Sequence, residues 1–254
     1  MKLLRLGIAV ALLTAIPGTT SAATATEPER QIMSKVNAAR ADQGLAPLRS
    51  DWRLWVLADE RAAAMASADV LSHGVAGSIE VGLERKGVQW YGHGEVIAYS
   101  SSTGSAAAAH LFELWASSPS HWALLVSRSF NYLGVGLARS GSGRTYGSIV
   151  LTESKDRTGA RGRMVSATVS GDDVRWTWRG VDPILQTHTA GLRDFAVQQR
   201  TDRGAWTTVT TSTTGTSRTI RDRPGGHWYG LRVRARDRAG NVGPWSAELR
   251  IWVP

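Results

Sequence analysis

Three histidines and one glutamate in the N-terminal half have the residue types of a catalytic or metal-binding site. His73 lies in "LSHG", His121 in "SPSHW", and Glu95 follows His93 in "YGHGEVIAYS". Imidazole nitrogen and carboxylate oxygen are the ligands of a borderline divalent metal such as zinc. A single histidine near apolar residues is usually structural, but three of them beside one acid favour a shared cleft.

Glu95 also needs a partner for a physical reason. If "GEVIAYS" forms a strand, the Glu95 side chain shares a face with Ile97 and Tyr99, because alternate residues of a strand point the same way. A carboxylate buried against apolar neighbours costs free energy unless it is paired. We expect His73 and His121 to pair with it, as hydrogen-bond donors or as fellow metal ligands. A buried Glu–His brace without chemistry is the alternative.

The residues favour binding over catalysis. The serines of "ASSPSHW" lie in a loop without the glycines of a nucleophile elbow, which disfavours a Ser–His hydrolase. A metal-activated water held by His73, Glu95 and His121 is chemically coherent, but no general base can be assigned beside it. We therefore expect a ligand-binding or metal-binding cleft. A metal-assisted hydrolase acting on peptide or cell-wall material is the alternative.

The elements that would position these residues are helices followed by a hairpin. Helices are expected over residues 29–43, after Asp51 in "SDWRLWVLADERAAAMASADVL", in "GSIEVGLERKG" and in "GSAAAAHLFELWASS". Beyond Phe130, "YLGVGLARSGSGRTYGSIVLTES" alternates large and small residues and breaks at glycines, which is typical of a β-hairpin. Helices first and a small antiparallel sheet after them predict an α+β domain.

These segments in their order resemble the bacterial form of the CAP superfamily (cysteine-rich secretory protein, antigen 5 and pathogenesis-related protein). The motifs are "GEVIA", "SPSH" and "NYLGVG", and the resemblance covers about Arg30 to Glu153. It implies an α-β-α sandwich with a central cleft, lined by two histidines and acidic groups, that holds a divalent ion in some members. The matching positions here are His73, Glu95 and His121, with zinc or another divalent cation as the implied cofactor.

This chain departs from the CAP pattern at two points. Val96 follows Glu95 where the family usually has an asparagine. The second acidic residue of the cleft has no direct match, so the resemblance implies Glu80 or Glu84 as the fourth group and Glu113 as a more distant candidate.

The C-terminal part has the pattern of a second, all-β domain. The polar stretch "SKDRTGARGR", residues 154–163, predicts a linker. Trp176, "YGLRVRARDRAGNVGPWS" and "ELRIWV" then alternate in the manner of short strands, which predicts a β-sandwich. This part resembles a fibronectin type III module over about Met164 to Pro254. Such modules are spacers or adhesive surfaces, so the resemblance implies no catalysis there.

The excess positive charge also lies in the C-terminal part. Residues 24–160 contain 13 basic and 13 acidic residues, whereas residues 161–254 contain 15 arginines and 8 acidic residues. Arg232, Arg234 and Arg236 alternate along one strand and suit bidentate contact with phosphate. We expect a cell-wall polymer, lipid or extracellular protein as partner, with nucleic acid disfavoured. A solvated face on which arginines stack on tryptophans is the alternative.

The N-terminus has the pattern of a secretory signal peptide, expected over residues 1–23. Lys2 and Arg5 precede an apolar run from Leu6 to Ile16, which is shorter than the ~20 residues that span a bilayer. An uncleaved anchor is the alternative, and no other segment is apolar enough to span a membrane. The chain has no cysteine, which excludes disulfides, cysteine zinc sites and thiol nucleophiles.

Together these patterns predict a secreted protein, extracellular or associated with the cell wall. The expected divisions are a signal peptide (1–23), a CAP-like domain (24–153), a linker (154–163) and a fibronectin-like domain (164–254). The first domain is expected to bind a ligand or divalent metal, and the second to act as a spacer or tether. A structural adhesin is a further alternative.

Overall fold

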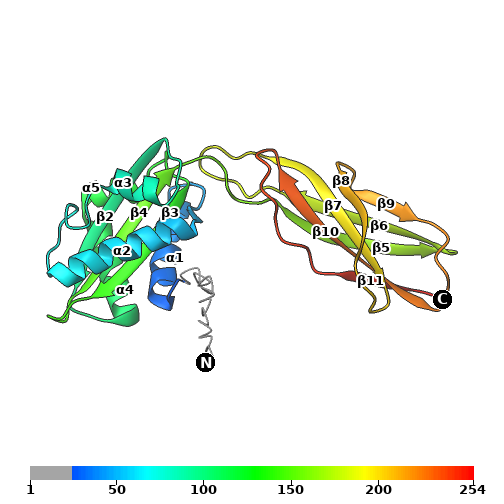
Figure 1. Ribbon diagram of the computed structural model, residues 1–254, viewed down its shortest axis with the longest axis horizontal. Helices are drawn as coiled ribbons and strands as arrows, with labels where there is room; N and C mark the ends of the chain where they lie inside the picture. Colours follow the sequence, from blue (N-terminus) through cyan, green and yellow to red (C-terminus); the bar gives the residue numbers. More distant parts are fainter. Residues whose placement is uncertain (1–24) are drawn as a thin grey trace, which may run out of the picture.

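The protein consists of two units joined end to end (Figure 1). We analysed a computed structural model, which describes residues 25–254. The expected signal peptide lies outside the described residues. Within the described part, no helix combines the length and the apolar character needed to cross a membrane.

The N-terminal unit is a four-stranded sheet with helices on both faces. Its elements are α1 (Glu27–Asp42), β1 (Arg49–Ser50), α2 (Trp52–Ala68), α3 (Ile79–Arg85), β2 (Gly92–Ser100), α4 (Gly104–Ser117), α5 (Pro119–Leu125), β3 (Tyr132–Arg139) and β4 (Thr145–Glu153). The strand order is β1-β3-β4-β2, antiparallel except where β1 runs parallel to β3. The expected α-β-α sandwich is confirmed.

One face of the sheet is covered by α2, at unusually short range. The helix begins after Asp51, whose side chain accepts a hydrogen bond from the Arg53 amide. Gly134 and Gly136 of β3 point toward it, and a Cβ atom at either position would lie 2.1 or 2.2 Å from the helix backbone. Only glycine permits this approach. The alternating glycines that predicted the hairpin therefore also leave room for α2 to pack closely on the sheet.

The other face is covered by α1 and α4. Trp115 and Leu111 of α4, together with Val36 of α1, belong to the same buried cluster as Val96 and Leu133 of the sheet. The short helix α5 was not expected from the sequence. It spans only two turns, so it carries too little periodicity to be recognised, although Pro119 stands in its first turn.

The C-terminal unit is a seven-stranded sandwich of two antiparallel sheets. Its strands are β5 (Arg161–Ser170), β6 (Asp173–Val181), β7 (Leu192–Thr201), β8 (Thr207–Thr213), β9 (Ser217–Ile220), β10 (His227–Asp237) and β11 (Leu249–Val253). They form sheets of order β11-β10-β7-β8 and β5-β6-β9. Trp176, Phe195 and Tyr229 fill the core between the sheets. The expected all-β sandwich is confirmed.

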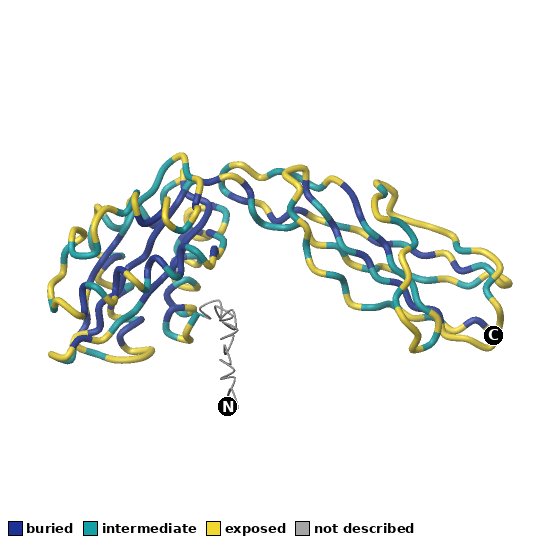
Figure 2. Tube along the Cα trace, in the orientation of Figure 1, coloured by how far each residue is buried: buried dark blue, intermediate teal, exposed yellow. Residues whose placement is uncertain are grey.

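The connection between the units is more ordered than its polar composition suggests. β5 already begins at Arg161, so it contains the last three residues of the expected linker. Ser154 and Ala160 are fully buried. The loop between β6 and β7, residues 182–191, also reaches back to the N-terminal unit, where Leu185 joins the buried cluster around Tyr132. Figure 2 shows buried backbone passing through this junction.

Candidate functional site

Arg61 of α2, rather than a histidine, is the main counter-ion of Glu95. Its Nη2 atom lies 2.8 Å from Oε2 of Glu95, and its Nε also donates to Oε1. Ser148 of β4 donates to Oε1 at 2.8 Å. The two charged side chains are only 4% and 5% exposed. A fork-shaped pair of this kind offsets much of the cost of burying both charges.

Arg61 also holds the loop that carries His73. Its Nη2 donates to the His73 carbonyl oxygen at 2.6 Å, and its Nη1 donates to the Gly77 carbonyl oxygen at 3.1 Å. The nitrogens of one buried guanidinium are thus shared between a strand and a loop. The position of His73 relative to Glu95 is consequently fixed through α2.

His73 contacts Glu95 directly, as the sequence predicted. Its Nδ1 lies 2.7 Å from Oε2 of Glu95, while the His73 side chain is 57% exposed. A carboxylate can only accept, so Nδ1 carries the proton. In the neutral ring, Nε2 is then left with a lone pair that can accept a hydrogen bond from a ligand.

Glu95 lines a hollow of about 550 Å³ together with several other charged and polar residues. The hollow is lined by Arg61, His73, Gly74, Gly77, Ser78, Ile79, His93, Gly94 and Glu95. Glu80 lies at its rim, where its Oε1 is 3.2 Å from Nε2 of His93. Of the acidic candidates, Glu80 is therefore near the cleft. Glu84 and Glu113 are exposed on α3 and α4 and line neither this hollow nor the next.

A second, more apolar hollow of about 430 Å³ lies beside β2, the edge strand of the sheet. It is lined by Leu71, Ile97, Ala98, Tyr99, His110, Leu114, Trp115, Ser118 and His121. Ile97 and Tyr99 continue the face that begins at Glu95, whereas Ala98 packs with Trp115 of α4 on the other face. The two hollows that border β2 are together called the cleft, with mostly charged and polar side chains around His73 and mostly apolar ones around Tyr99.

His121 belongs to the apolar part of the cleft. Burial lowers the pKa of His121, and the charge of His73 lowers it further, so the ring is neutral near pH 7. Its Nδ1 is buried and has no hydrogen-bond partner within the part of the chain that the structure describes. The structure thus places His73, Glu95 and His121 around one cleft, with direct contact between the first two.

The three residues do not form a compact metal-ligand set as they stand. Among residues 25–254, the groups whose ligand atoms all lie within 4.8 Å of one another consist of aspartates outside this cleft. Arg61 moreover occupies both oxygens of Glu95. Two imidazoles are left, fewer than the three protein ligands of a catalytic zinc site.

Comparison with known proteins assigns the first unit to a family. Residues 33–152 match the sequence model of the cysteine-rich secretory protein family, whose domain is called CAP. The N-terminal unit is a CAP domain. No protein of curated function matches the chain.

Solved structures similar to parts of the chain come from several bacteria. An extracellular protein with an SCP domain from Bacillus anthracis is 23% identical (TM-score 0.43) over 50% of this chain and 40% of its own length. An outer surface protein from Borrelia burgdorferi is 18% identical (TM-score 0.45; 51% and 95%). An Fn3-like protein from Clostridium thermocellum is 25% identical (TM-score 0.29; 38% and 95%). The part of the chain that is similar to this Fn3-like protein is the C-terminal sandwich.

Arg61 is the residue of the CAP cleft that sequence reasoning missed. It lies three residues after Ala58 and seven after Leu54, on the apolar stripe of α2. A charge on the buried stripe of a helix requires a buried counter-ion. Because Glu95 is an acid that also needs a buried partner, this requirement could have predicted that Arg61 pairs with Glu95.

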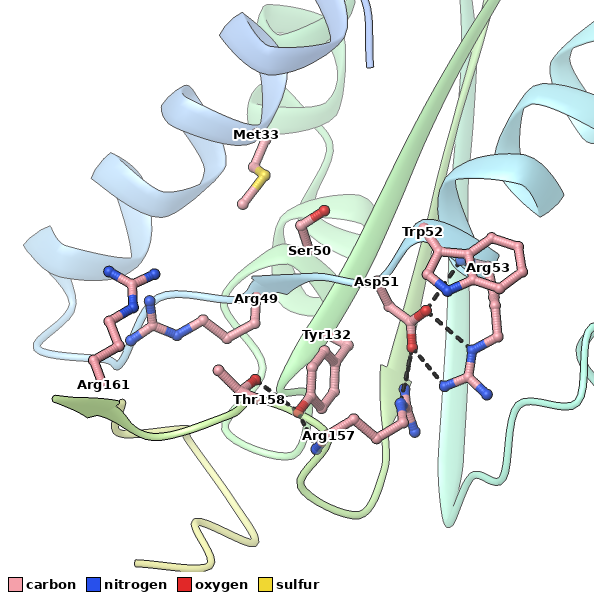
Figure 3. A pocket seen from close by; sticks show the side chains of 10 residues that line it. All are labelled: Met33, Arg49, Ser50, Asp51, Trp52, Arg53, Tyr132, Arg157, Thr158 and Arg161. Carbon is pink, nitrogen blue, oxygen red and sulfur yellow. Dashed lines mark hydrogen bonds and ion pairs between the residues drawn. The ribbon is translucent and has the colours of Figure 1, made fainter. Parts of the chain in front are cut away.

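A third hollow, of about 530 Å³, lies where the CAP domain meets the connector (Figure 3). Four arginines line it, and three of them, Arg49, Arg53 and Arg157, have structural partners. Arg53 and Arg157 both bind Asp51, Arg157 stacks on Tyr132, and Arg49 donates to the carbonyl of Ile184. The contacts of these arginines stabilise the junction between the units.

The arginines predicted as an anionic-partner surface lie on β10 and are engaged within the sandwich. Arg232 stacks on Trp206 and Trp245, with distances of 4.2 and 4.8 Å to the ring centres. Arg234 stacks on Trp245, and Arg236 forms two hydrogen bonds to Asp194. The geometry matches the stacked-arginine alternative, and binding of an anionic partner stays a prediction.

Proposed function

We propose that the CAP domain is a binding module whose cleft takes a small amphipathic molecule with a hydroxyl-bearing head. The observation that supports this is the pair of hollows that border β2, one lined mostly by charged and polar side chains around His73 and the other mostly by apolar side chains around Tyr99. Leu71, Tyr99 and Leu114 are large apolar side chains left exposed beside the apolar hollow. Apolar surface with a few placed polar groups is the usual form of a small-ligand site.

The head of the ligand would bind at His73. Its Nδ1 donates to Glu95, so in the neutral tautomer Nε2 can accept a hydrogen bond from a hydroxyl group. Burial lowers the pKa of His121, whose Nδ1 has no hydrogen-bond partner among the described residues. An uncharged ring at the apolar end suits an uncharged ligand better than an anion.

Arg61 argues for binding over hydrolysis. A carboxylate that accepts from a guanidinium at both oxygens is poorly placed to act as a general base or metal ligand. Zinc therefore stays a prediction, with only the two imidazoles as candidate ligands. Calorimetric titration with zinc would contradict the proposal if uptake occurred and was lost in both His73→Ala and His121→Ala.

The proposal places this module outside the cell. The leader pattern at residues 1–23 and the absence of cysteine are consistent with export of a protein that folds by burial alone. The fibronectin-like unit would act as a spacer or tether that presents the CAP cleft at the envelope.

A single-chain lipid with a glycerol head and a terminal NBD fluorophore tests the binding function. We expect its fluorescence to rise on binding. Leu114→Asp should weaken affinity by about tenfold or more, because it puts a charge into the apolar hollow. His73→Ala should weaken it by about 2- to 10-fold through loss of one hydrogen bond.

Val81→Asp is the matched control. Val81 is 60% exposed on α3 and lines neither hollow, so this substitution should leave the affinity unchanged. Absence of saturable binding by the wild-type protein, or equal loss in Val81→Asp and Leu114→Asp, would overturn the proposal.

A further inference from the structure

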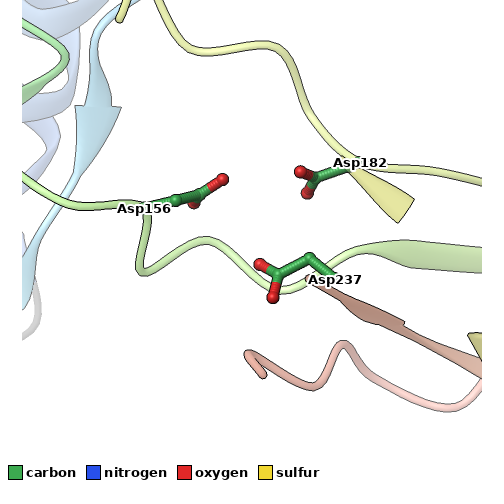
Figure 4. Close-up of side chains that lie close together, drawn as sticks. All are labelled: Asp156, Asp182 and Asp237. Atoms are coloured by element: carbon green, nitrogen blue, oxygen red, sulfur yellow. The ribbon is translucent and has the colours of Figure 1, made fainter. Parts of the chain in front are cut away.

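Three buried aspartates converge at the junction between the two units (Figure 4). Asp156 lies in the connector, Asp182 directly follows β6, and Asp237 ends β10. They are 6%, 6% and 0% exposed. One oxygen of each lies within 4.8 Å of the others. In Figure 4 the three side chains point toward a common centre.

No positive charge balances this cluster within residues 25–254. None of the three carboxylates forms an ion pair with a lysine, arginine or histidine there. Their hydrogen-bond donors are all neutral: the amides of Thr158, Ala190, Gly191 and Asn241, the side chain of Asn241 and the hydroxyl of Tyr132. Burying several carboxylates without compensation is strongly unfavourable.

Asp182 gives an independent sign that something is missing from the cluster. Its Oδ1 is buried and has no hydrogen-bond partner among residues 25–254, whereas its Oδ2 accepts from the Gly191 amide. Buried carboxylate oxygens are normally satisfied, so an orphaned one calls for an explanation.

We propose that Asp156, Asp182 and Asp237 bind a divalent hard cation, with calcium as the best fit. The available ligands are all oxygen, which suits calcium or magnesium and not zinc. Calcium–oxygen distances of about 2.3–2.6 Å allow ligands on opposite sides of one ion to lie about 5 Å apart. The separation of the three oxygens falls within this limit. Oδ1 of Asp182 becomes a ligand, which removes the orphaned atom.

The bound cation would join the two units. Asp156 belongs to the connector, and its Oδ1 accepts from the Tyr132 hydroxyl of the CAP sheet at 3.3 Å. Asp182 and Asp237 belong to the sandwich, and Asp182 begins the loop that reaches back to the CAP domain. One ion would therefore fix the connector, the loop and the end of β10 together.

Thermal unfolding of the full chain, with calcium or magnesium added after chelation, tests the proposal. Saturating calcium should raise the Tm by about 5 °C, and magnesium should raise it less. Asp182→Asn should abolish the shift, because it removes the orphaned oxygen's charge while keeping its shape. Calcium should also slow proteolysis of the connector in the wild-type chain.

Asp172→Asn is the matched control. Asp172 belongs to a second, largely exposed aspartate group with Asp173 and Asp222, and its loss should leave the calcium response intact. Calorimetric titration of the wild-type chain keeps the proposal testable if Asp182→Asn fails to fold. Absence of calcium uptake by the wild type, or a response lost in Asp172→Asn and kept in Asp182→Asn, would overturn the proposal.

Discussion

At the scale of single residues, the ion pair between Arg61 and Glu95 organises the CAP cleft. The carboxylate is too deeply buried to remain unpaired, and the guanidinium satisfies it at both oxygens while tying down the His73 loop. Paired burial of this kind adds little net stability, but loss of one partner leaves an uncompensated charge. The pair therefore matters more for the shape of the site than for the stability of the fold.

Arg61→Met should lower the free energy of unfolding by about 3–5 kcal/mol, because Glu95 would remain buried without a counter-ion. Arg61→Met combined with Glu95→Gln should recover part of this loss. Arg85→Met is the control, since Arg85 and Glu60 form an exposed pair worth about 1 kcal/mol or less. Urea unfolding measures all three, and equal losses at Arg61 and Arg85 would contradict the interpretation.

The sequence predicted the contacts of Glu95 only in part. The need for a partner followed from strand alternation, and His73 is in contact as expected. The stronger partner, Arg61, lies 34 residues earlier in the chain on a helix that looked simply Ala-rich. Partner choice depends on how a helix is rotated against the sheet, and residue types alone do not fix that rotation.

At the scale of elements, α1 and α2 meet through two acidic side chains. Burial and the nearby carboxylate of Glu29 raise the pKa of Asp59 to about 7, although a hydrogen bond from the Leu137 amide opposes the shift. Glu29 itself is buried in the first turn of α1, where it forms a capping box with Thr26. Contact between the helices is thus sensitive to protonation.

This pair should make stability depend on pH. The folded-state pKa of Asp59 lies above the unfolded value of about 3.9, so between about pH 4 and pH 7 the folded chain holds a proton that the unfolded chain releases. The free energy of unfolding should therefore fall as pH rises through this window. After allowance for solvent screening, we expect a contribution of about 1–2 kcal/mol.

Asp59→Asn should flatten this dependence, as measured by urea unfolding at about pH 5 and about pH 8. Asp42→Asn, at an exposed position of α1, serves as the control and should keep the wild-type slope. An unchanged slope in Asp59→Asn would show that other groups cause it.

The elements themselves were largely predictable. The four long or capped helices and the hairpin follow from periodicity, an N-cap at Asp51 and paired glycines. The docking of the loop at residues 182–191 could not be predicted, because Leu185 is a lone apolar residue in a polar stretch. Its burial depends on a surface supplied by the other unit, which no local pattern reports.

At the scale of the whole molecule, the loop at residues 182–191 holds the units together. Besides the burial of Leu185, the Gln186 side chain accepts from the Ala46 amide at 2.8 Å, and His188 lies 2.9 Å from Glu153. The two units are therefore expected to move as one body rather than as two domains that reorient independently.

Leu185→Asp should release this loop. Loss of about 2 kcal/mol or more of docking energy would raise the population of the opened junction by about 30-fold. Faster proteolysis of the connector and a broader distribution of dimensions in small-angle scattering would report the opening. Ile184→Asp is the control, since Ile184 is 66% exposed and contacts Arg49 only through its carbonyl. Equal effects of both changes would contradict this role of Leu185.

The close approach of α2 to β3 also has a consequence for the cleft at Glu95. Gly134 and Gly136 set the spacing between helix and sheet, and the same helix carries Arg61 toward Glu95. A methyl group at either glycine would lift the helix and draw the guanidinium away from the carboxylate. Two positions that do not line the cleft thus set the distance between Arg61 and Glu95. Selection on the cleft should therefore constrain them as tightly as its lining residues.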